Sequence, residues 1–218
     1  MKKVFTVLAV AAAMLVCGTA NAQLGVYAGY APNKILTSYD GGTPDTIGLN
    51  GFMVGASYNL PVSNGLNVSV GLQYRMNTST KESQGTLFGV TGYTKQEHNQ
   101  SLIDIPVLLN YGFDVSNGVK LSILAGPTFS LALSGSTHTV INASGYGTGL
   151  TLYDGTANWY DENAKNNTFD ISGTLGLCLN FNNILIFGGY NMGLLNLSTA
   201  DKTVRKANAF FVGAGYAL

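Results

Sequence analysis

The stretch LNVSVGLQYRMN, residues 66–77, alternates apolar and polar side chains without an exception. Successive side chains of a β-strand point to opposite faces, so this strand separates an apolar environment from a polar one. In a soluble sheet the apolar face packs on the core. In a membrane barrel the apolar face meets lipid and the polar face lines the lumen. One strand satisfies both arrangements, and the choice therefore depends on the rest of the chain.

Seven further stretches carry an apolar residue at every second position. They are residues 24–30, 52–60, 103–113, 121–133, 169–181, 184–197 and 210–218. Most of them exceed the ~5–6 residues usual for strands of soluble sheets and suit the ~9–11 residues of tilted membrane-spanning strands. No segment after residue 22 has convincing helical periodicity. The number of expected strands is eight, which is even.

Short and long connections alternate along the chain. Asn-Gly pairs at residues 64–65 and 117–118, and Asn182-Asn183, mark three tight turns, and Asn-Gly suits the positive φ that primed hairpin turns require. The other connections are expected to be long polar loops, at residues 32–50, 78–100, 134–166 and 198–206. Short turns at one end and long loops at the other are typical of outer-membrane barrels, whose long loops lie outside the cell. The chain is therefore predicted to be all-β, an eight-stranded antiparallel transmembrane β-barrel with four external loops.

Composition and aromatic placement favour the membrane barrel over a soluble sheet. Charged residues make up 10% of the chain, against ~25% in ordinary soluble domains, so much of the surface is not expected to face water. Aromatic residues on the apolar faces gather near both ends of the strands, as two membrane interfaces select. We therefore expect the apolar face of residues 66–76 to meet lipid, and Arg75 to point into the lumen.

The first 22 residues have the pattern of a secretory signal peptide. A basic start precedes an apolar run too short to span a membrane, and Ala20-Asn21-Ala22 forms a small-x-small cleavage site. Cys17 allows a lipoprotein as the rival interpretation, but the branched Val16 before it does not suit lipid attachment. We expect a cleaved signal at residues 1–22, a barrel domain at residues 23–218 and export to the outer membrane.

The mature chain has few other distinguishing features. Without Lys2 and Lys3, nine basic residues stand against 11 acidic ones, and the net charge of 9 − 11 = −2 gives no reason to expect nucleic acid as a partner. Cys178 is the single remaining cysteine, so no internal disulfide can form, and we expect it to be a small side chain filling a strand position.

Three segments resemble a known family: SLIDIPVLLNYGF at residues 101–113, LSILAGPTFSLAL at 121–133 and TFDISGTLGLCLNF at 168–181. They are similar to the PorT-like outer-membrane β-barrel domain family of Gram-negative anaerobes. The resemblance implies a small barrel in the outer membrane, and it makes Pro106 and Pro127 features of the family. Each proline removes a ladder hydrogen bond from a sheet without edges, for which a β-bulge is the expected accommodation. Because named members assist protein secretion, an accessory role in secretion is one functional alternative.

Three charged residues, Arg75, Asp104 and Asp170, fall on the polar face near the loop ends of their strands. They are expected either to form an ion-pair network that plugs the barrel, or to bind a small ligand or gate a narrow conduit. Side chains just fill the interior of an eight-stranded barrel, so a general diffusion pore is not expected. Desolvated charges must be paired, which favours the plug.

Catalytic, cofactor and metal sites are not expected. His98 and His138 lie in predicted loops with no rigid element to hold them, and 39 positions apart they do not match a metal-binding spacing. Gly145-x-Gly147-x-Gly149 lacks the strand-to-helix context that a phosphate site requires. A barrel enzyme, lipid-modifying or proteolytic, remains the first functional alternative, ahead of the secretion accessory.

The third long loop carries four aromatic residues among glycines and small polar residues: Tyr146, Tyr153, Trp159 and Tyr160. This composition suits adaptable recognition, although the same rings could rest on the barrel rim or on lipid headgroups. We expect a non-enzymatic structural or surface-interaction protein that acts through its external loops. Its expected partners are outer-membrane lipid, the barrel-assembly machinery during biogenesis, and a surface ligand or host partner.

Overall fold

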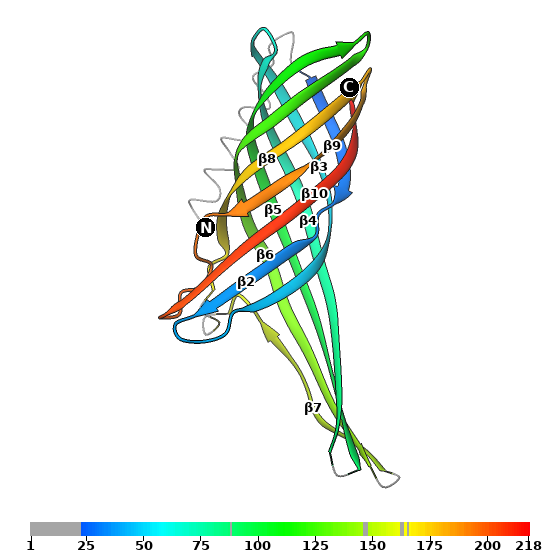
Figure 1. Ribbon diagram of the computed structural model, residues 1–218, viewed down its shortest axis with the longest axis vertical. Coiled ribbons are helices and arrows are strands. Elements are labelled where there is room, and N and C mark those ends of the chain that lie inside the picture. Colours follow the sequence, from blue (N-terminus) through cyan, green and yellow to red (C-terminus); the bar gives the residue numbers. More distant parts are fainter. Residues whose placement is uncertain (1–22, 88, 146–147, 162–163, 165) are drawn as a thin grey trace.

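The computed structural model describes residues 23–218 except 88, 146–147, 162–163 and 165, and its regular structure consists of β-strands (Figure 1). The strands are β1 (Gln23–Tyr30), β2 (Asn33–Tyr39), β3 (Asp45–Ser63), β4 (Leu66–Leu87), β5 (Val90–Ser116), β6 (Val119–Gly145), β7 (Thr148–Asn158), β8 (Phe169–Phe181), β9 (Ile184–Gly193) and β10 (Thr203–Ala217). Within the described part of the chain, no helix is long and apolar enough to cross a membrane. The expected signal peptide at residues 1–22 and Tyr146 lie outside the described residues.

The strands pair antiparallel and close into a ring in the order β1, β3, β4, β5, β6, β8, β9, β10 and back to β1. At the seam, β1 and β10 pair from Gly25 opposite Ala217 to Tyr30 opposite Val212. The predicted eight-stranded antiparallel barrel is therefore confirmed. The short turns between β3 and β4, β5 and β6, and β8 and β9 lie at one end of the barrel, which we call the turn end. The other connections lie toward the opposite end, the loop end (Figure 1).

The first spanning strand is longer than expected, because β2 continues β1 after a break at Ala31-Pro32. Tyr30 pairs with Phe52 and Asn33 with Leu49, so the register against β3 is the same on both sides of the break. Proline has no N–H to donate, which explains why the ladder is interrupted at that point. The expected loop at residues 32–50 is therefore wrong: most of it is strand, and only the connection between β2 and β3 is a turn.

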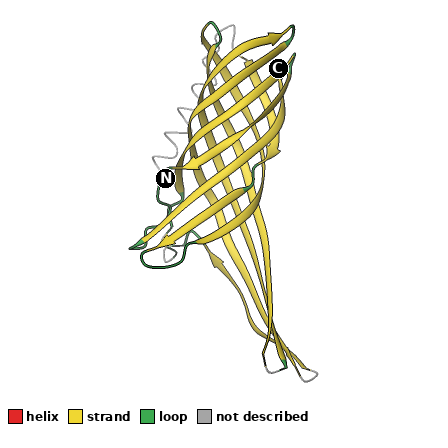
Figure 2. Cartoon of the chain, viewed as in Figure 1, coloured by secondary structure: helices red, strands yellow, loops and turns green. Residues whose placement is uncertain are grey.

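Two other expected loops are also strands. β4, β5 and β6 run far beyond the barrel and, together with β7, form a four-stranded antiparallel sheet that projects from the loop end (Figure 2). We call this sheet, residues 78–87, 90–100, 134–145 and 148–158, the outer ribbon. The sequence pattern did not indicate this sheet, because both of its faces lie in water and neither face requires apolar side chains. Its strands are rich in Thr and Ser but do not alternate strictly between apolar and polar residues.

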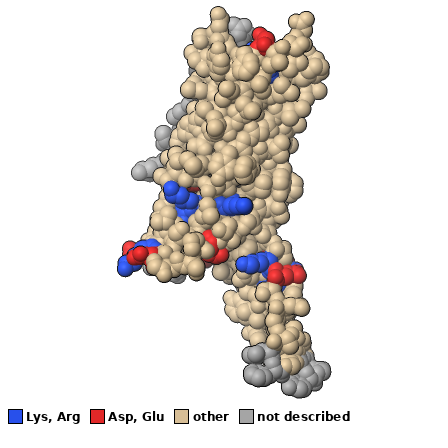
Figure 3. Space-filling view, viewed as in Figure 1, with Lys and Arg blue, Asp and Glu red and all other residues tan. Residues whose placement is uncertain are grey.

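The two faces of the barrel wall differ as the alternation predicts. In β8, Leu175 and Leu177 are 63% and 53% exposed on the outside, whereas Thr174, on the lumen side, is 7% exposed. In the stretch at residues 66–77, Leu72, Tyr74 and Met76 are exposed on the outside, whereas Arg75 is buried inside. Figure 3 shows a broad uncharged zone on the barrel between charges near its two ends. The apolar face of the barrel is therefore the one that meets lipid.

Pro106 and Pro127 lie in a part of the β5–β6 hairpin that has no bulge. The register of β5 against β6 is the same on both sides of the prolines, and Pro106 lies opposite Thr128. A Cβ atom at Gly126 would collide with the β5 backbone, so glycine allows the two strands to approach closely at this point. The hairpin does contain register shifts, between Ser101 and Leu102 and between Asp114 and Ser116, but both lie away from the prolines, where the ladder is interrupted locally while its register is kept.

Replacing Leu175 by arginine should impair assembly, because an arginine facing lipid near the middle of the membrane costs ~2–4 kcal/mol. Asn180→Arg, on the same strand but facing the lumen near the turn end, is the matched control and should be better tolerated. The measurement is the fraction of folded barrel in outer-membrane fractions, read from heat-modifiable gel mobility. Equal tolerance of the two arginines would contradict the assignment of the faces.

Candidate functional site

A cavity of about 440 Å³ lies in the half of the lumen nearest the short turns. Gly118 and Asn182, which belong to turns, and Ala217 at the end of β10 lie at its rim, so it opens at the turn end. Arg75 lines its inner end. We call it the turn-end cavity. With the turn end in the periplasm, it faces the periplasmic side of the outer membrane.

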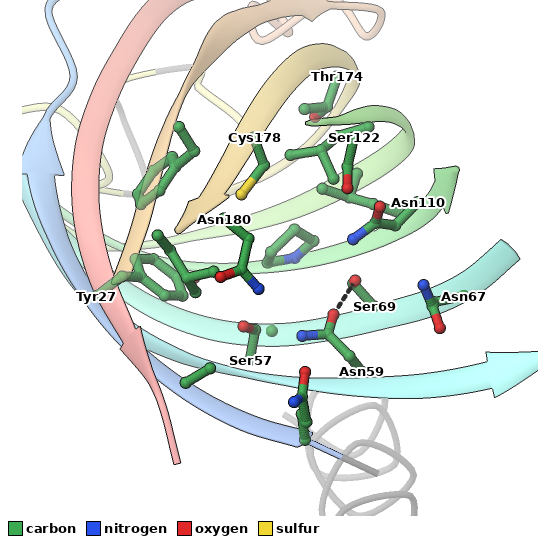
Figure 4. Close-up of a pocket in the computed structure, with 18 of the residues that line it drawn as sticks. Tyr27, Ser57, Asn59, Asn67, Ser69, Asn110, Ser122, Thr174, Cys178 and Asn180 are labelled. Atoms are coloured by element: carbon green, nitrogen blue, oxygen red, sulfur yellow. Dashed lines mark hydrogen bonds between the residues drawn. The ribbon is translucent and has the colours of Figure 1, made fainter. Parts of the chain in front are cut away.

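One part of the cavity wall is formed by amides and hydroxyls from β3, β4, β5, β6 and β8. These side chains include Ser57, Asn59, Asn67, Ser69, Asn110, Ser122, Thr174 and Asn180 (Figure 4). Asn59 and Ser69 hydrogen-bond to each other, whereas the carbonyl oxygens of Asn110 and Asn180 are buried without a hydrogen-bond partner. The amides of Asn110 and Asn180 therefore have hydrogen-bonding capacity that the protein does not use.

The other part of the wall, from β1, β9 and β10, is aromatic. The rings of Tyr27 and Phe187 meet edge to face with centroids 5.4 Å apart, and the centroid of Phe211 lies 6.3 Å from that of Phe187. Glycines make room for these rings, since a Cβ at Gly189 or Gly213 would collide with Phe211 or Phe187. Sequence analysis missed this cluster because it assigned aromatic residues to the lipid face. The glycines at neighbouring lumen positions are the signal that could have indicated it.

Arg75 and Asp104 close the inner end of the cavity. Arg75 Nε lies 2.9 Å from Asp104 Oδ2, and Arg75 Nη2 donates to Asp104 Oδ1 at 3.1 Å. Gln73 Nε2 also donates to Asp104 Oδ2 at 2.9 Å, and Tyr27 donates to Gln73 Oε1 at 3.3 Å. Asp104 is fully buried, and its partners supply the donors that a desolvated carboxylate needs. We call the Arg75–Asp104 pair the plug.

Asp170 does not belong to the plug. It faces the lumen at the loop end of β8, but it forms no ion pair with Arg75 or with any other cation among the described residues. A void of about 20 Å³, lined by Arg75, Gln100, Tyr160 and Asp170 among others, lies beside both charges. The structure therefore pairs two of the three predicted cluster residues and places the third beside them without an ion pair.

Trp159 and Tyr160 cover the loop end of the lumen at the base of the outer ribbon. Gln100 Nε2 donates to the Tyr160 hydroxyl at 2.7 Å, and Trp159 Nε1 donates to Thr137 Oγ1 at 2.8 Å. Tyr153 is exposed on β7 instead. The structure therefore does not gather the predicted recognition residues on one surface: Trp159 and Tyr160 pack at the base of the outer ribbon, Tyr153 faces solvent, and Tyr146 is not among the described residues.

The histidines lie in the outer ribbon. His98 is buried and its Nδ1 lies 2.9 Å from Thr137 Oγ1, so its expected solvated loop position is wrong. Burial lowers the pKa of His98, and nearby Lys81 lowers it further. His138, which is half-exposed, has Nε2 2.8 Å from Asp154 Oδ1 and Nδ1 3.9 Å from Glu97 Oε2. The described residues contain no group of three or more His, Cys, Asp or Glu side chains that could hold a metal ion.

A known protein family matches most of the chain. Residues 19–199 match the family described as outer membrane protein beta-barrel domain. The attachment invasion locus protein Ail of Yersinia pestis is similar, at 18% identity over 90% of this chain and 99% of that one, with a TM-score of 0.37. Neisserial surface protein A is similar at 14% identity over 90% and 98% of the two chains, with a TM-score of 0.39. The outer membrane enzyme PagL is 10% identical over 85% and 98%, with a TM-score of 0.36. No curated protein matches the chain.

Removing Arg75 should destabilise the barrel strongly. Arg75→Ala leaves the buried Asp104 carboxylate without its cation, and breaking a buried pair from one side costs ~3–5 kcal/mol. Adding Asp104→Asn should restore much of that loss, since coupled residues are not additive. Asp170→Asn is the control and should have little effect, because Asp170 is not paired with Arg75. The free energy of unfolding of the wild type and the three variants is measured by urea unfolding in detergent. An Arg75→Ala variant as stable as the wild type would contradict the stabilising role of the plug.

Proposed function

Because the chain belongs to the outer membrane protein beta-barrel domain family, we propose that it is a non-enzymatic outer-membrane protein that acts at the cell surface through its outer ribbon. The observation that supports this role most strongly is the ribbon itself. β5 and β6 are 27 residues long, far more than the ~9–11 that a tilted spanning strand needs, so much of each strand stands beyond the membrane.

The edges of the outer ribbon suit protein recognition. In the described structure β7 pairs only with β6, so its second edge presents unpaired backbone N–H and C=O groups. An exposed edge can take up an extended segment of a partner as an additional strand. Leu150 and Leu152 on β7 are 63% and 60% exposed, which gives such a partner apolar contacts beside the backbone pairing.

The arrangement of reactive side chains supports a role without catalysis. The carboxylate of Asp104 is neutralised by Arg75, and His98 and His138 bond to Thr137 and Asp154, not to a serine nucleophile. A Ser-His mechanism needs the serine and the base within hydrogen-bond reach of each other. We therefore propose binding and not hydrolysis as the activity of the loop end.

The proposal also covers the route to the outer membrane, the relationship to the PorT-like family and the alternative of an accessory role in secretion. Export through a cleaved signal peptide at residues 1–22 and insertion by the barrel-assembly machinery follow from a place in the outer membrane. Membership of the PorT-like subgroup is supported by the segments around Pro106 and Pro127, which both lie in the barrel wall. A secretion accessory would use the same outer ribbon to meet its partner.

The test compares two double variants displayed on a non-adherent Gram-negative host. Leu150→Glu with Leu152→Glu places two charges on the β7 edge and should remove most of the binding of these cells to epithelial monolayers and immobilised matrix proteins. Val62→Glu with Val115→Glu is the matched control at the turn end, where each valine is 60% exposed, and should leave binding unchanged. Wild-type display that adds no binding, or equal binding by both double variants, would contradict the proposal.

A further inference from the structure

The turn-end cavity lies at the opposite end of the barrel from the outer ribbon, and the proposed surface role does not use it. We infer that this cavity is a binding site for a neutral, polyhydroxylated ligand of about one or two sugar rings, entering from the turn end. Its volume of about 440 Å³ falls within the ~300–1,000 Å³ of small-molecule sites. The plug closes its inner end, so the cavity is a blind pocket and not a channel.

The charges around the cavity favour a neutral ligand. Arg75 is neutralised by Asp104, at 2.9 Å. The other charged residues in the lining are one acid and one base near the rim, Asp114 and Lys120. These side-chain charges balance, so the side chains of the lining offer no net charge to attract an anion or a cation.

The hydrogen-bonding groups favour hydroxyls over an acyl chain. Asn110, Asn180 and Asn191 line the cavity, and the carbonyl oxygen of each is buried without a hydrogen-bond partner. Each amide has an NH₂ group that donates and a carbonyl oxygen that accepts, and a ligand hydroxyl can do both. Rotation of the amide side chains therefore allows them to hydrogen-bond to the hydroxyls of such a ligand. An acyl chain would fill the cavity but leave these amides without partners, which is unfavourable for buried polar groups.

The aromatic part of the wall provides the apolar contacts that a sugar ring needs beside its hydrogen bonds. Tyr27, Phe187 and Phe211 offer a continuous apolar surface beside the amides. A pyranose ring has the same division, with C–H groups on its faces and hydroxyls around its edge. The ring can therefore rest on the aromatic side chains while its edge bonds to the amides, as in sites that combine an apolar lining with a few placed polar groups.

Cys178 provides a direct readout, because it lines the cavity and is the single cysteine of residues 23–218. The protein is isolated from outer membranes in a zwitterionic detergent that carries no sugar. A small methanethiosulfonate reagent then labels the thiol, and peptide mass spectrometry follows the label at Cys178. Cellobiose and N,N′-diacetylchitobiose are the neutral probes, and decanoate is the acyl comparator. We expect a disaccharide well above its Kd to slow labelling by about fivefold or more, and decanoate to leave it unchanged.

Two neighbouring phenylalanines give the matched variants. Phe211→Ala removes part of the aromatic wall and should abolish protection, whereas Phe210→Ala, on the lipid face, should keep it. Asn180→Leu should also lose protection. If a variant does not fold, protection in the wild-type protein still decides the question.

The other outcomes overturn the inference. Protection by decanoate alone would show an acyl-chain site. Equal labelling with and without every probe would show a cavity that holds only water. A Cys178 that does not react in the free protein would show that the cavity is closed at the turn end.

Discussion

Closure of the sheet is the constraint on which the rest of this structure depends. Lipid offers no hydrogen bonds, so every backbone N–H and C=O within the membrane must be paired inside the protein. The eight spanning strands meet this requirement only because β10 returns to β1 along a continuous seam. The chain keeps the register intact even where a proline interrupts the ladder. At Ala31-Pro32 the neighbouring backbone still bonds across the break, with the Ala31 N–H donating to the Gly51 oxygen at 2.7 Å.

A closed barrel of eight strands then dictates what the lumen can hold. The interior is narrow enough for side chains to fill it, and charges placed there must find partners. Arg75 and Asp104 meet this requirement for each other, supported by Gln73. The turn-end half is left open because many of its lumen positions carry small side chains or glycine, and aromatic rings occupy only part of the released space. The barrel is therefore blocked by its plug and hollow on the periplasmic side of it.

The outer ribbon shows that closure ends where the membrane ends. Beyond the loop end the backbone can bond to water, so strands need not form a ring. There β4 to β7 continue as an open sheet with two free edges. The same hairpins thus serve two environments, as closed wall in lipid and as an open projection in water. Within the described residues, Trp159 and Tyr160 mark the boundary by packing at the base of the ribbon.

The spanning strands were predictable because lipid on one side and a polar lumen on the other impose strict alternation, as at residues 66–77. The outer ribbon was not predictable in this way, since water on both sides removes the alternation and leaves only β propensity. The predicted first strand ended before Pro32, because a proline ordinarily ends a strand. Only its pairing with β3 in the structure shows that the strand continues after the proline. Arg75 and Asp104 were predictable as neighbours on adjacent strands. The absence of an ion pair between Asp170 and Arg75 depends on distances across the lumen, which spacing along the chain does not encode.

The seam between β1 and β10 offers the most direct test of the central claim, that this chain closes into a barrel in the membrane. Ala28 and Ala214 are paired across the seam and both face outward. Paired positions of antiparallel strands lie ~4.5–5.5 Å apart, within reach of a disulfide. In a Cys178→Ser background, Ala28→Cys with Ala214→Cys should give an intramolecular crosslink on mild oxidation in membranes. Ala28→Cys with Phe210→Cys, out of register on the same face, should not. Crosslinks that form only between molecules, or equally in both pairs, would show an open sheet and contradict the account.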